Sequence, residues 1–339
     1  MQPSYIPVKE LWLKHSSQEI AVVLNGFIDE SYDHAKVPKV FSMSCTVTSV
    51  AGWCYLEIDW LKLLARKNEE LKKQGRKEIS RFHAAPFNNF KGEFKDWTPD
   101  EQKEFSREIV EVFNRNPVHT HGYCMPLQLL VQEFPETKPN PIGFAYITLL
   151  TRLMQQIGET TLALYPRDVI SLHHDHCDYD AALQEQFGSL LEDSSFKYRN
   201  RFTSLTAEHS QHCALLQPAD FVAYENFKEA MREYSKRNRR QSLERLLSLD
   251  AVSGRLKGFT VDGIRELKSN IDRLSVKAKK ILFATVGIPY VNDAEKFDTT
   301  VRKILSVSHD ELKRREKEWK RKRAKKKRVR KPASRAPRA

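Results

Sequence analysis

The chain has 339 residues, of which 40% are hydrophobic, and this is enough material for one large domain with an appendage. No apolar stretch reaches the roughly 18 to 20 residues that cross a bilayer, and the first residues lack the charged start and hydrophobic centre of a signal peptide. We therefore expect a soluble cytoplasmic protein with no membrane partner. The five cysteines are widely spaced and include no CxxC pair, which argues against a disulfide framework and a cysteine zinc finger.

The formal net charge of +13 comes entirely from the C-terminal end. Residues 311–339 contain 16 Lys or Arg and 3 Glu, whereas residues 1–310 contain 41 basic and 41 acidic side chains. Such a basic tail predicts contact with nucleic acid, and an acidic partner or ribosome surface is the alternative. We expect a solvated helix that fades into disorder and has no sequence selectivity, since Trp319 is its one aromatic residue. The densest run of predicted nucleic-acid contacts is Lys320, Arg321, Lys322, Arg323, Lys325, Lys326, Lys327 and Arg328.

A buried strand that ends in acid is predicted near the N-terminus, after a short helix around residues 8–14. The apolar run from Ile20 to Ile28 is rich in β-branched residues and leads directly into Asp29 and Glu30. A second strand from Val40 to Val47 follows, so the two are expected to form an antiparallel hairpin that starts a mixed sheet. A carboxylate at the tip of a buried strand is costly unless a cation such as a metal ion meets it.

The next part of the chain is mainly helical in pattern. Trp53 to Ile58 fits either a third strand or the beginning of the helix that continues over Leu61 to Lys73. A helix over Pro99 to Phe113 is well signalled, because Thr98 can cap it and Glu101 can close a capping box. Between these helices, residues 79–86 are expected to be extended.

The second half alternates between helices and strands. After an apolar helix from Ile142 to Ile157, we expect a strand at 168–172, a helix at 179–191, a strand at 202–205 and a helix at 215–234. This alternation implies parallel strands joined by crossovers, and ligands gather at the carboxyl ends of such strands. The rule brings Asp175, His209 and His212 to one edge of the sheet. We expect the first strand to be parallel to these two, so Asp29 would join them.

The last predicted helix carries a carboxylate beside its apolar face. Helical spacing places Leu216, Ala219, Ala223 and Phe227 on one face, with Asp220 on or next to it. Beyond residue 236 the pattern indicates short amphipathic helices at 242–249, 261–274 and 294–305. We therefore divide the chain into a domain at 1–235, a helical appendage at 236–310 and a basic tail at 311–339.

Four segments together resemble the domain-of-unknown-function family numbered 3800. Residues 27–31 (FIDES) and 217–223 (QPADFVA) resemble its first and last signatures, and 82–84 with 91–94 and the strand that ends at Asp175 are further matches. The resemblance covers roughly residues 21 to 232, outside the appendage and the tail. Pro218 departs from the Leu that the family often has there, a change that a helix start tolerates.

The resemblance implies a ribonuclease-H-like fold, which is a mixed five-stranded sheet flanked by helices. Members of that group hold divalent metal with an acid on the first strand, another after the fourth strand and a third on the last helix. Carried over to this sequence, the three acids are Asp29, Asp175 and Asp220. Because the second acid lies in a run of histidines, Asp178 and Asp180 are alternatives to Asp175.

A cluster of carboxylates favours Mg²⁺ or Mn²⁺, since these hard cations prefer oxygen ligands. Two such ions about 3.5 to 4 Å apart can activate a water and stabilise the leaving oxygen in phosphodiester hydrolysis. In this interpretation Asp29 bridges the ions, Asp175 and Asp220 each anchor one, and Glu30 or Glu93 completes the shell. The alternatives are a strand-end turn for Asp29 and an ion pair with Lys or Arg for Asp220.

The histidines allow a second interpretation. Two groups follow the two parallel strands: His173, His174, His176 and Cys177, and His209, His212 and Cys213. Nitrogen and sulfur ligands suit zinc, but neither group has the spacing of a zinc finger, so the sequence disfavours zinc. A single histidine facing the carboxylates as a proton shuttle is the stronger prediction. His83, in the family-like segment at 82–84, is either such a site residue or a structural one.

These features predict a metal-dependent nuclease, or another phosphoryl-transfer enzyme, that acts on nucleic acid held partly by the basic tail. The main alternative is a noncatalytic nucleic-acid-binding or regulatory protein, for instance one of a defence system or mobile element. A zinc protein with incidental carboxylates is a third hypothesis. The sequence does not distinguish DNA from RNA and sets no oligomeric state.

Deleting residues 311–339 is expected to weaken binding to DNA or RNA, and to flatten the dependence of the binding constant on salt, because each neutralised phosphate releases counterions. Fluorescence anisotropy with a labelled oligonucleotide over a series of salt concentrations measures both effects. Deleting only residues 331–339, which removes three cations, is the control and should have a small effect. Unchanged affinity in the longer deletion would contradict the role of the tail.

Overall fold

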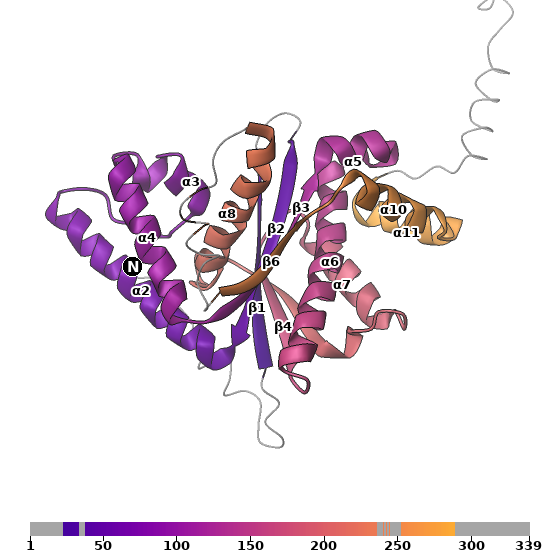
Figure 1. The fold of residues 1–339 in the computed structure, drawn as a ribbon, viewed down its shortest axis with the longest axis horizontal. Coiled ribbons are helices and arrows are strands. Elements are labelled where there is room, and N and C mark those ends of the chain that lie inside the picture. The colour runs from indigo at the N-terminus through magenta and orange to yellow at the C-terminus, as the bar shows by residue number, and fades with distance from the viewer. Residues whose placement is uncertain are drawn as a thin grey trace, which may run out of the picture. The chain divides into compact units, whose positions relative to one another are not determined.

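A six-stranded mixed β-sheet in the order β5-β4-β1-β2-β3-β6 forms the centre of the molecule (Figure 1). The computed structural model describes residues 23–33, 38–235, 240, 242, 244 and 252–288, which belong to one compact unit ending at Ile288. The predicted helices at 8–14 and 294–305, most of the one at 242–249, and the basic tail lie outside these residues. No helix in the described ranges combines the length and the hydrophobicity that crossing a membrane requires.

The predicted hairpin and parallel strands are confirmed. β1 (Val23–Tyr32) pairs antiparallel with β2 (Val40–Ser49), and β2 pairs antiparallel with β3 (Val118–Pro126). On its other side β1 is parallel to β4 (Val169–Asp175), which is in turn parallel to β5 (Phe202–Glu208). The carboxyl ends of β1, β4 and β5 therefore meet at one edge of the sheet.

The prediction of five strands is wrong, because a sixth strand extends the sheet. β6 (Val252–Gly258) pairs parallel with β3, and it lies in the stretch where the sequence indicated only short helices. Its sequence, VSGRLKG, has two glycines and two apolar residues, so it lacks the hydrophobic alternation by which strands are recognised. An edge strand of this kind forms because β3 offers it backbone hydrogen-bonding groups.

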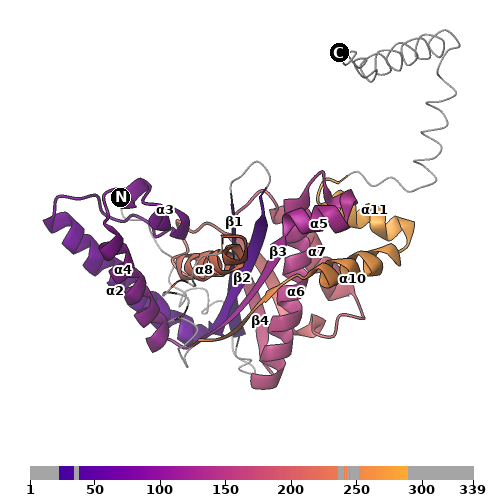
Figure 2. The same ribbon diagram turned by 45° about the horizontal axis from the view of Figure 1, so that its top comes forward.

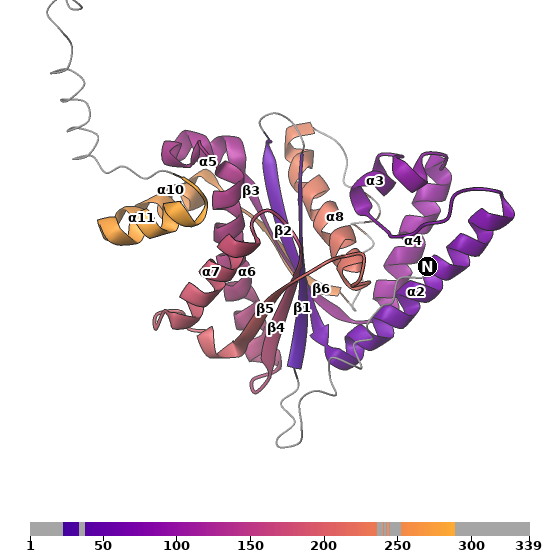
Figure 3. The same cartoon turned by 180° about the vertical axis from the view of Figure 1, so that it is seen from behind.

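Helices cover both faces of the sheet, as the opposite views in Figures 1 and 3 show. One face carries α2 (Val50–Lys73), α3 (Ala84–Asn88), α4 (Pro99–Arg115) and α8 (Leu216–Ser235). The other carries α5 (Leu127–Glu133), α6 (Pro141–Leu164), α7 (Asp180–Glu192), α10 (Val261–Asp272) and α11 (Val276–Thr285). Short 3₁₀ helices η1 (Gly92–Phe94), η2 (Pro135–Thr137) and η3 (Arg199–Arg201) lie in the connections.

Local sequence signals explain where several of these helices begin. The hydroxyl of Ser49 accepts a hydrogen bond from the Gly52 amide, so residues 53–58 continue a helix and do not form a third strand. The capping box predicted at α4 is present, with the Thr98 and Glu101 side chains each bonded to the other's backbone amide. The predicted buried face of α8 is likewise confirmed, because its apolar residues are at most 5% exposed.

An aromatic core fixes the segment before α3 against α8. α8 packs on β1 and β2 (Figure 2). The buried side-chain oxygen of Gln217, near the start of α8, accepts hydrogen bonds from the Trp60 indole nitrogen at 3.2 Å and from the Phe82 amide at 3.1 Å. The Phe82 ring lies among Trp60, Phe87 and further aromatic rings. Residues 82–84 are therefore held beside the first turns of α8.

Candidate active site

The three acids predicted to hold metal line one cavity of about 790 Å³. Asp29 lies on β1, Asp175 is the last residue of β4, and Asp220 lies near the start of α8. β1 and β4 are parallel with Ile28 beside His174, so the following residues of the two strands, Asp29 and Asp175, reach the same end of the sheet. The structure thus brings together side chains that are 191 residues apart in the chain.

Asp29 lies in an electrostatically unfavourable position, because it is buried beside other acids. Its side chain is buried, with an exposed fraction of 8% for the residue. Burial first, and then the negative charges of Asp220, Glu30 and Asp175, raise the pKa of Asp29 well above its usual value. The Asp220 side chain is also within hydrogen-bonding reach of Asp29, and this contact adds to the rise in the pKa of Asp29. A cation between the carboxylates would offset their repulsion.

Asp220 is positioned by the segment before α3. Its Oδ2 atom accepts a hydrogen bond from the Ala84 amide at 2.7 Å and lies 2.8 Å from Nδ1 of His83. The bond to Asp220 raises the pKa of the His83 imidazole, whose side chain is 47% exposed. The partner of Asp220 is therefore a histidine and a backbone amide, not the Lys or Arg of the alternative interpretation.

Asp175 is the acid of its loop that reaches the cavity. Its Oδ1 accepts hydrogen bonds from the backbone amides of His176 and Ser210, both at 3.0 Å. Of the two sequence alternatives, Asp178 is exposed, and Asp180 accepts a hydrogen bond from the Cys177 amide at 2.9 Å. Neither Asp178 nor Asp180 lines the cavity.

The two glutamates considered with these acids occupy different places. Glu30 lines the cavity, and its hydrogen bond with Tyr146 on α6 shows that it approaches from the other face of the sheet. Burial is the main reason why the pKa of Glu30 rises to about 7. Glu93 lies outside the cavity, where its carboxylate accepts hydrogen bonds from the amide of Ser80 at 2.9 Å and from the hydroxyl at 2.6 Å.

Basic and aromatic residues that were not predicted from the sequence also line the cavity, together with Asp33 and with Glu229, which pairs with Arg232 at 3.1 Å. The basic and aromatic residues are Arg81, Tyr224, Phe227, Lys228, Arg232 and Arg240. The Lys228 ammonium lies 4.9 Å from the centre of the Tyr224 ring, and Nη1 of Arg81 donates to the Ser210 hydroxyl at 2.7 Å. Positions 220, 224, 228 and 232 of α8 are four residues apart, so acid, aromatic and basic side chains lie along one stripe of the helix. This spacing is the sequence signal from which they could have been predicted.

Arg240 is anchored at the cavity by a buried acid on α8. Its Nε atom lies 3.0 Å from Oε2 of Glu225, whose side chain has no exposed surface, and its Nη2 atom donates to Asn88 at 2.5 Å. Burial raises the pKa of Glu225, and the guanidinium of Arg240 opposes that shift. A basic residue from the linker after α8 thereby becomes part of the cavity wall.

The two histidine groups that follow β4 and β5 have different surroundings. Of the first group, His174 and Cys177 lie near Asp180, on the side of the sheet that faces α7. His173 points to the opposite face, where its ring stacks on Phe27 at 4.9 Å. In the second group, His209 contacts the ring of His176 at 4.8 Å.

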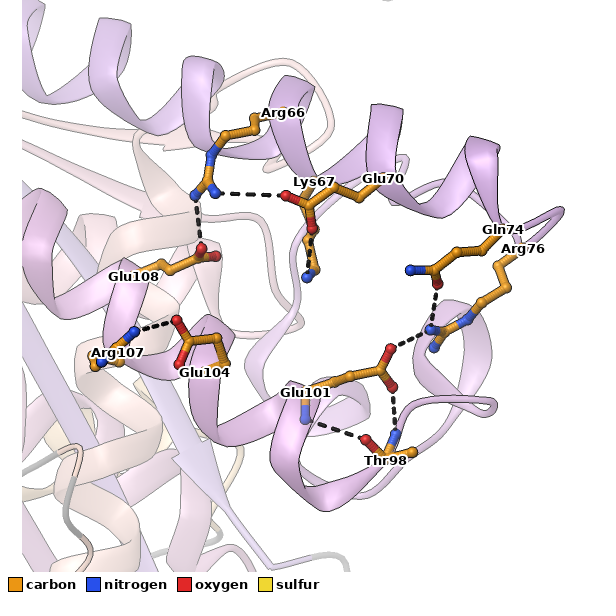
Figure 4. Close-up of polar contacts among 10 residues, drawn as sticks. All are labelled: Arg66, Lys67, Glu70, Gln74, Arg76, Thr98, Glu101, Glu104, Arg107 and Glu108. Atoms are coloured by element: carbon orange, nitrogen blue, oxygen red, sulfur yellow. Dashed lines mark hydrogen bonds and ion pairs between the residues drawn. The ribbon is translucent and has the colours of Figure 1, made fainter.

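A second cavity, of about 410 Å³, lies between α2 and α4 and is lined mainly by charged residues. Figure 4 shows that four of these charged residues, Arg66, Glu104, Arg107 and Glu108, form ion pairs. Arg66 pairs with Glu108 at 2.8 Å and with Glu70 at 3.6 Å, and Arg107 pairs with Glu104. Exposed pairs of this kind contribute little to stability, and they leave balanced charge in the groove. The cavity that contains Asp29 is the better candidate for chemistry.

Comparisons with protein-family models and with curated proteins find no match for this chain. The resemblance to the domain-of-unknown-function family 3800 therefore depends on the residues quoted from the sequence, and it enters the functional argument as a proposal.

Metal-free protein is expected to lose stability as the pH rises from about 4.5 to about 7, because folded Glu30 keeps its proton in this window while unfolded Glu30 has released it. The raised pKa of Asp29 acts in the same direction. Glu30→Gln should make the free energy of unfolding less dependent on pH in this range. Urea denaturation followed by tryptophan fluorescence at a series of pH values measures the slope.

The control for this experiment is Glu69→Gln, at an exposed position of α2, which should keep the wild-type slope. Equal slopes for wild type and Glu30→Gln would show that Glu30 does not hold its proton in the folded state.

Proposed function

We propose that this protein is a metal-dependent nuclease, or a related phosphoryl-transfer enzyme, with a ribonuclease-H-like fold. The observation that carries the proposal is the convergence of Asp29, Asp175 and Asp220 on one cavity, in which burial and then the charges of neighbouring acids raise the pKa of Asp29. Buried carboxylates in contact are costly without a cation, and perturbed pKa values in a cleft are typical of functional sites.

The placement of the acids supports the fold assignment. The three acids belong to the first strand, the end of the fourth strand and α8, the helix that follows the fifth strand, which matches the arrangement that the resemblance implies for residues 21 to 232. β1 to β5 form a mixed sheet with helices on both faces, and β6 adds a strand at one edge next to β3. That edge is the far side of β3 from β1, so the added strand leaves the acids in place.

The donor set fits a hard divalent cation. Asp29, Asp175 and Asp220 offer carboxylate oxygens, which suit Mg²⁺ or Mn²⁺. A bound cation of this kind supplies a water of lowered pKa and counter-charge for a leaving oxygen. The chain itself fixes the ligands beforehand: backbone amides hold Asp175 and Asp220 in place, and Asp29 is held by the strand pairing. Preorganised ligands of this kind lose little entropy when an ion binds.

His83 is suited to move a proton in this cavity. Asp220 occupies its Nδ1 atom, so Nε2 is the ring nitrogen that can exchange a proton with a substrate or a water. The raised pKa of His83 increases the protonated fraction near neutral pH, which suits a general acid that protonates a leaving oxygen. The 47% exposure of the side chain leaves it accessible to a substrate.

The basic residues of the cavity allow it to accept a polyanionic substrate, although six acids, including Asp33 and Glu229, also line it. Arg81, Lys228, Arg232 and Arg240 line the same cavity as Asp29, so phosphates next to the scissile one would meet positive charge. Tyr224 and Phe227 add aromatic surface on which a base can stack. Phosphate contacts position a strand without reading its sequence, so we infer a nucleic-acid substrate without strong sequence preference.

A noncatalytic nucleic-acid-binding or regulatory protein is the second candidate. The raised pKa of Asp29 favours it, because a protonated Asp29 can donate a hydrogen bond to Asp220 without a cation. In that case the basic part of the cavity and the basic tail would bind nucleic acid while the acids serve only the fold. None of the five cysteines, which all lie in the described part of the chain, forms a disulfide, and we retain a cytoplasmic location as part of the proposal.

Purified full-length protein is expected to cleave DNA or RNA in the presence of Mg²⁺ or Mn²⁺. Asp29→Asn and Asp220→Asn should each lower the rate by at least about 100-fold, because each removes charge that the reaction requires. His83→Gln should lower it by roughly 10²- to 10⁴-fold if His83 is the general acid. Labelled single- and double-stranded oligonucleotides of both types, separated on gels, provide the measurement.

Asp178→Asn is the matched control, since this exposed acid follows the same strand as Asp175 but lies outside the cavity. It should retain the wild-type rate. Absence of cleavage with both metals, or full activity in Asp29→Asn, would reject the nuclease and leave the binding protein.

Mg²⁺ or Mn²⁺ is expected to raise the melting temperature of the wild-type protein and not that of Asp29→Asn. Binding to the native state alone stabilises it by roughly 2.7 kcal/mol at 100 times the dissociation constant. Without metal, Asp29→Asn should melt at or above the wild-type temperature at pH 8, because an amide removes the cost of a buried charge. Differential scanning fluorimetry in chelator-treated buffer tests both statements, and equal metal responses would contradict them.

A further inference from the structure

We propose that His174, Cys177 and Asp180 form a second metal site, selective for zinc, on the opposite side of the sheet from Asp220. The proposal is independent of the nuclease function, because none of the three residues lines the cavity that contains Asp29. One ligand atom from each residue lies within 4.8 Å of those of the other two. Ligands around a tetrahedral zinc ion are roughly 3.5 Å apart, given bonds of about 2.0 to 2.3 Å, so a small contraction closes the site.

The fold places the three residues on the face that carries α7. Successive side chains of a strand point to opposite faces. His173 stacks on Phe27 on the face of α2, so the next residue, His174, points to the face of α7. Cys177 lies in the turn after β4, and Asp180 is the first residue of α7. Figure 1 shows α7 and α8 on opposite sides of the sheet, so this cluster and Asp220 approach the strand ends from different directions.

The His174 ring gives independent support for a ligand. Its side chain is 3% exposed, and its Nδ1 atom lies 3.0 Å from the backbone carbonyl oxygen of Asp175. The same Nδ1 atom lies 3.7 Å from Oδ1 of Asp180, so Nδ1 is the ring nitrogen that faces the cluster and would bind an ion in place of its proton. In the described part of the chain, the buried Nε2 atom has no hydrogen-bond partner.

Further contacts around the site suit an ion. Asp180 is oriented by a hydrogen bond from the Cys177 amide at 2.9 Å and by an ion pair with His176. Tyr146, on α6, has hydrogen bonds with both Cys177 and Glu30, and its ring stacks on Tyr179 at 4.6 Å. Aromatic side chains thus enclose one side, while Asp180, at 21% exposure, leaves a route for entry.

The donor set distinguishes this site from the carboxylate cavity. A nitrogen, a thiolate sulfur and a carboxylate oxygen match zinc, whereas Mg²⁺ and Mn²⁺ prefer oxygen alone. Three protein ligands leave a fourth position for water. Because Asp175 lies between two of the ligands in the chain, zinc would fix the turn that presents Asp175 to the other face. The structure thus assigns the zinc a structural role.

Metal analysis of the full-length protein tests the proposal. After reconstitution with excess zinc and removal of unbound metal, mass spectrometry should find about one zinc ion per chain. Cys177→Ser and His174→Gln should each lower this value at least about tenfold. The controls are Cys213→Ser and His212→Gln, at the end of β5 and outside the cluster, which should keep the zinc. Asp29→Asn should also keep it, so loss of nuclease activity and loss of zinc remain separate results.

Cobalt provides a readout on the wild-type protein itself. Co²⁺ bound by a thiolate gives a sulfur-to-metal charge-transfer absorption, which should appear with wild type and Cys213→Ser and disappear with Cys177→Ser. Absence of this band in wild type, or zinc content unaffected by Cys177→Ser, would overturn the proposal. Circular dichroism of the metal-free variants shows whether they fold, and the wild-type cobalt spectrum decides the question even if they do not.

Discussion

The parallel pairing of β1 with β4 is the constraint on which the chemistry of this protein depends. Ile28 lies beside His174 in that pairing, so Asp29 and Asp175 follow at the same end of the sheet. A shift of one residue would turn every side chain of the strand to the other face. The alternation that directs Asp29 towards α8 also directs Glu30 and His174 towards α6 and α7. One register therefore fixes the carboxylate cavity and the proposed zinc site together.

α8 completes the site that this register begins, because it positions Asp220 beside the segment at 82–84. Gln217 binds the segment at 82–84 through the Phe82 amide, and this segment supplies both the His83 imidazole and the Ala84 amide to Asp220. The aromatic core around Phe82 thereby supports the position of an acid several ångströms away. Packing and chemistry share residues here, and substitutions in this core would be expected to disturb the site as well as stability.

Residues 1–310 carry no net charge, but the fold gathers acidic and basic side chains from distant segments in one cavity. Three acids lie near the strand ends, and α8 and the linker after it bring basic residues to the same cavity, where Arg232 pairs with Glu229. A phosphodiester needs both, because the metal-binding acids repel a polyanion that nearby cations attract. The net charge of residues 1–310 does not reveal this arrangement, because it adds charges regardless of where the fold places them.

Four local features could be predicted from linear patterns: an acid on the first strand, the capping box at Thr98, the buried face of α8 and the parallel order of the later strands. These depend on periodicity and on nearby residues, which a linear pattern contains. The first strand itself continues past Asp29 to Tyr32. The remaining features follow from packing between distant segments. β6 forms because β3 has an open edge. Arg240 lies at the cavity because it pairs with the buried Glu225. Asp180 lies near His174 and Cys177 and not with the carboxylates of the cavity. Contacts between distant segments follow from the register and packing of the whole sheet, which no local pattern encodes.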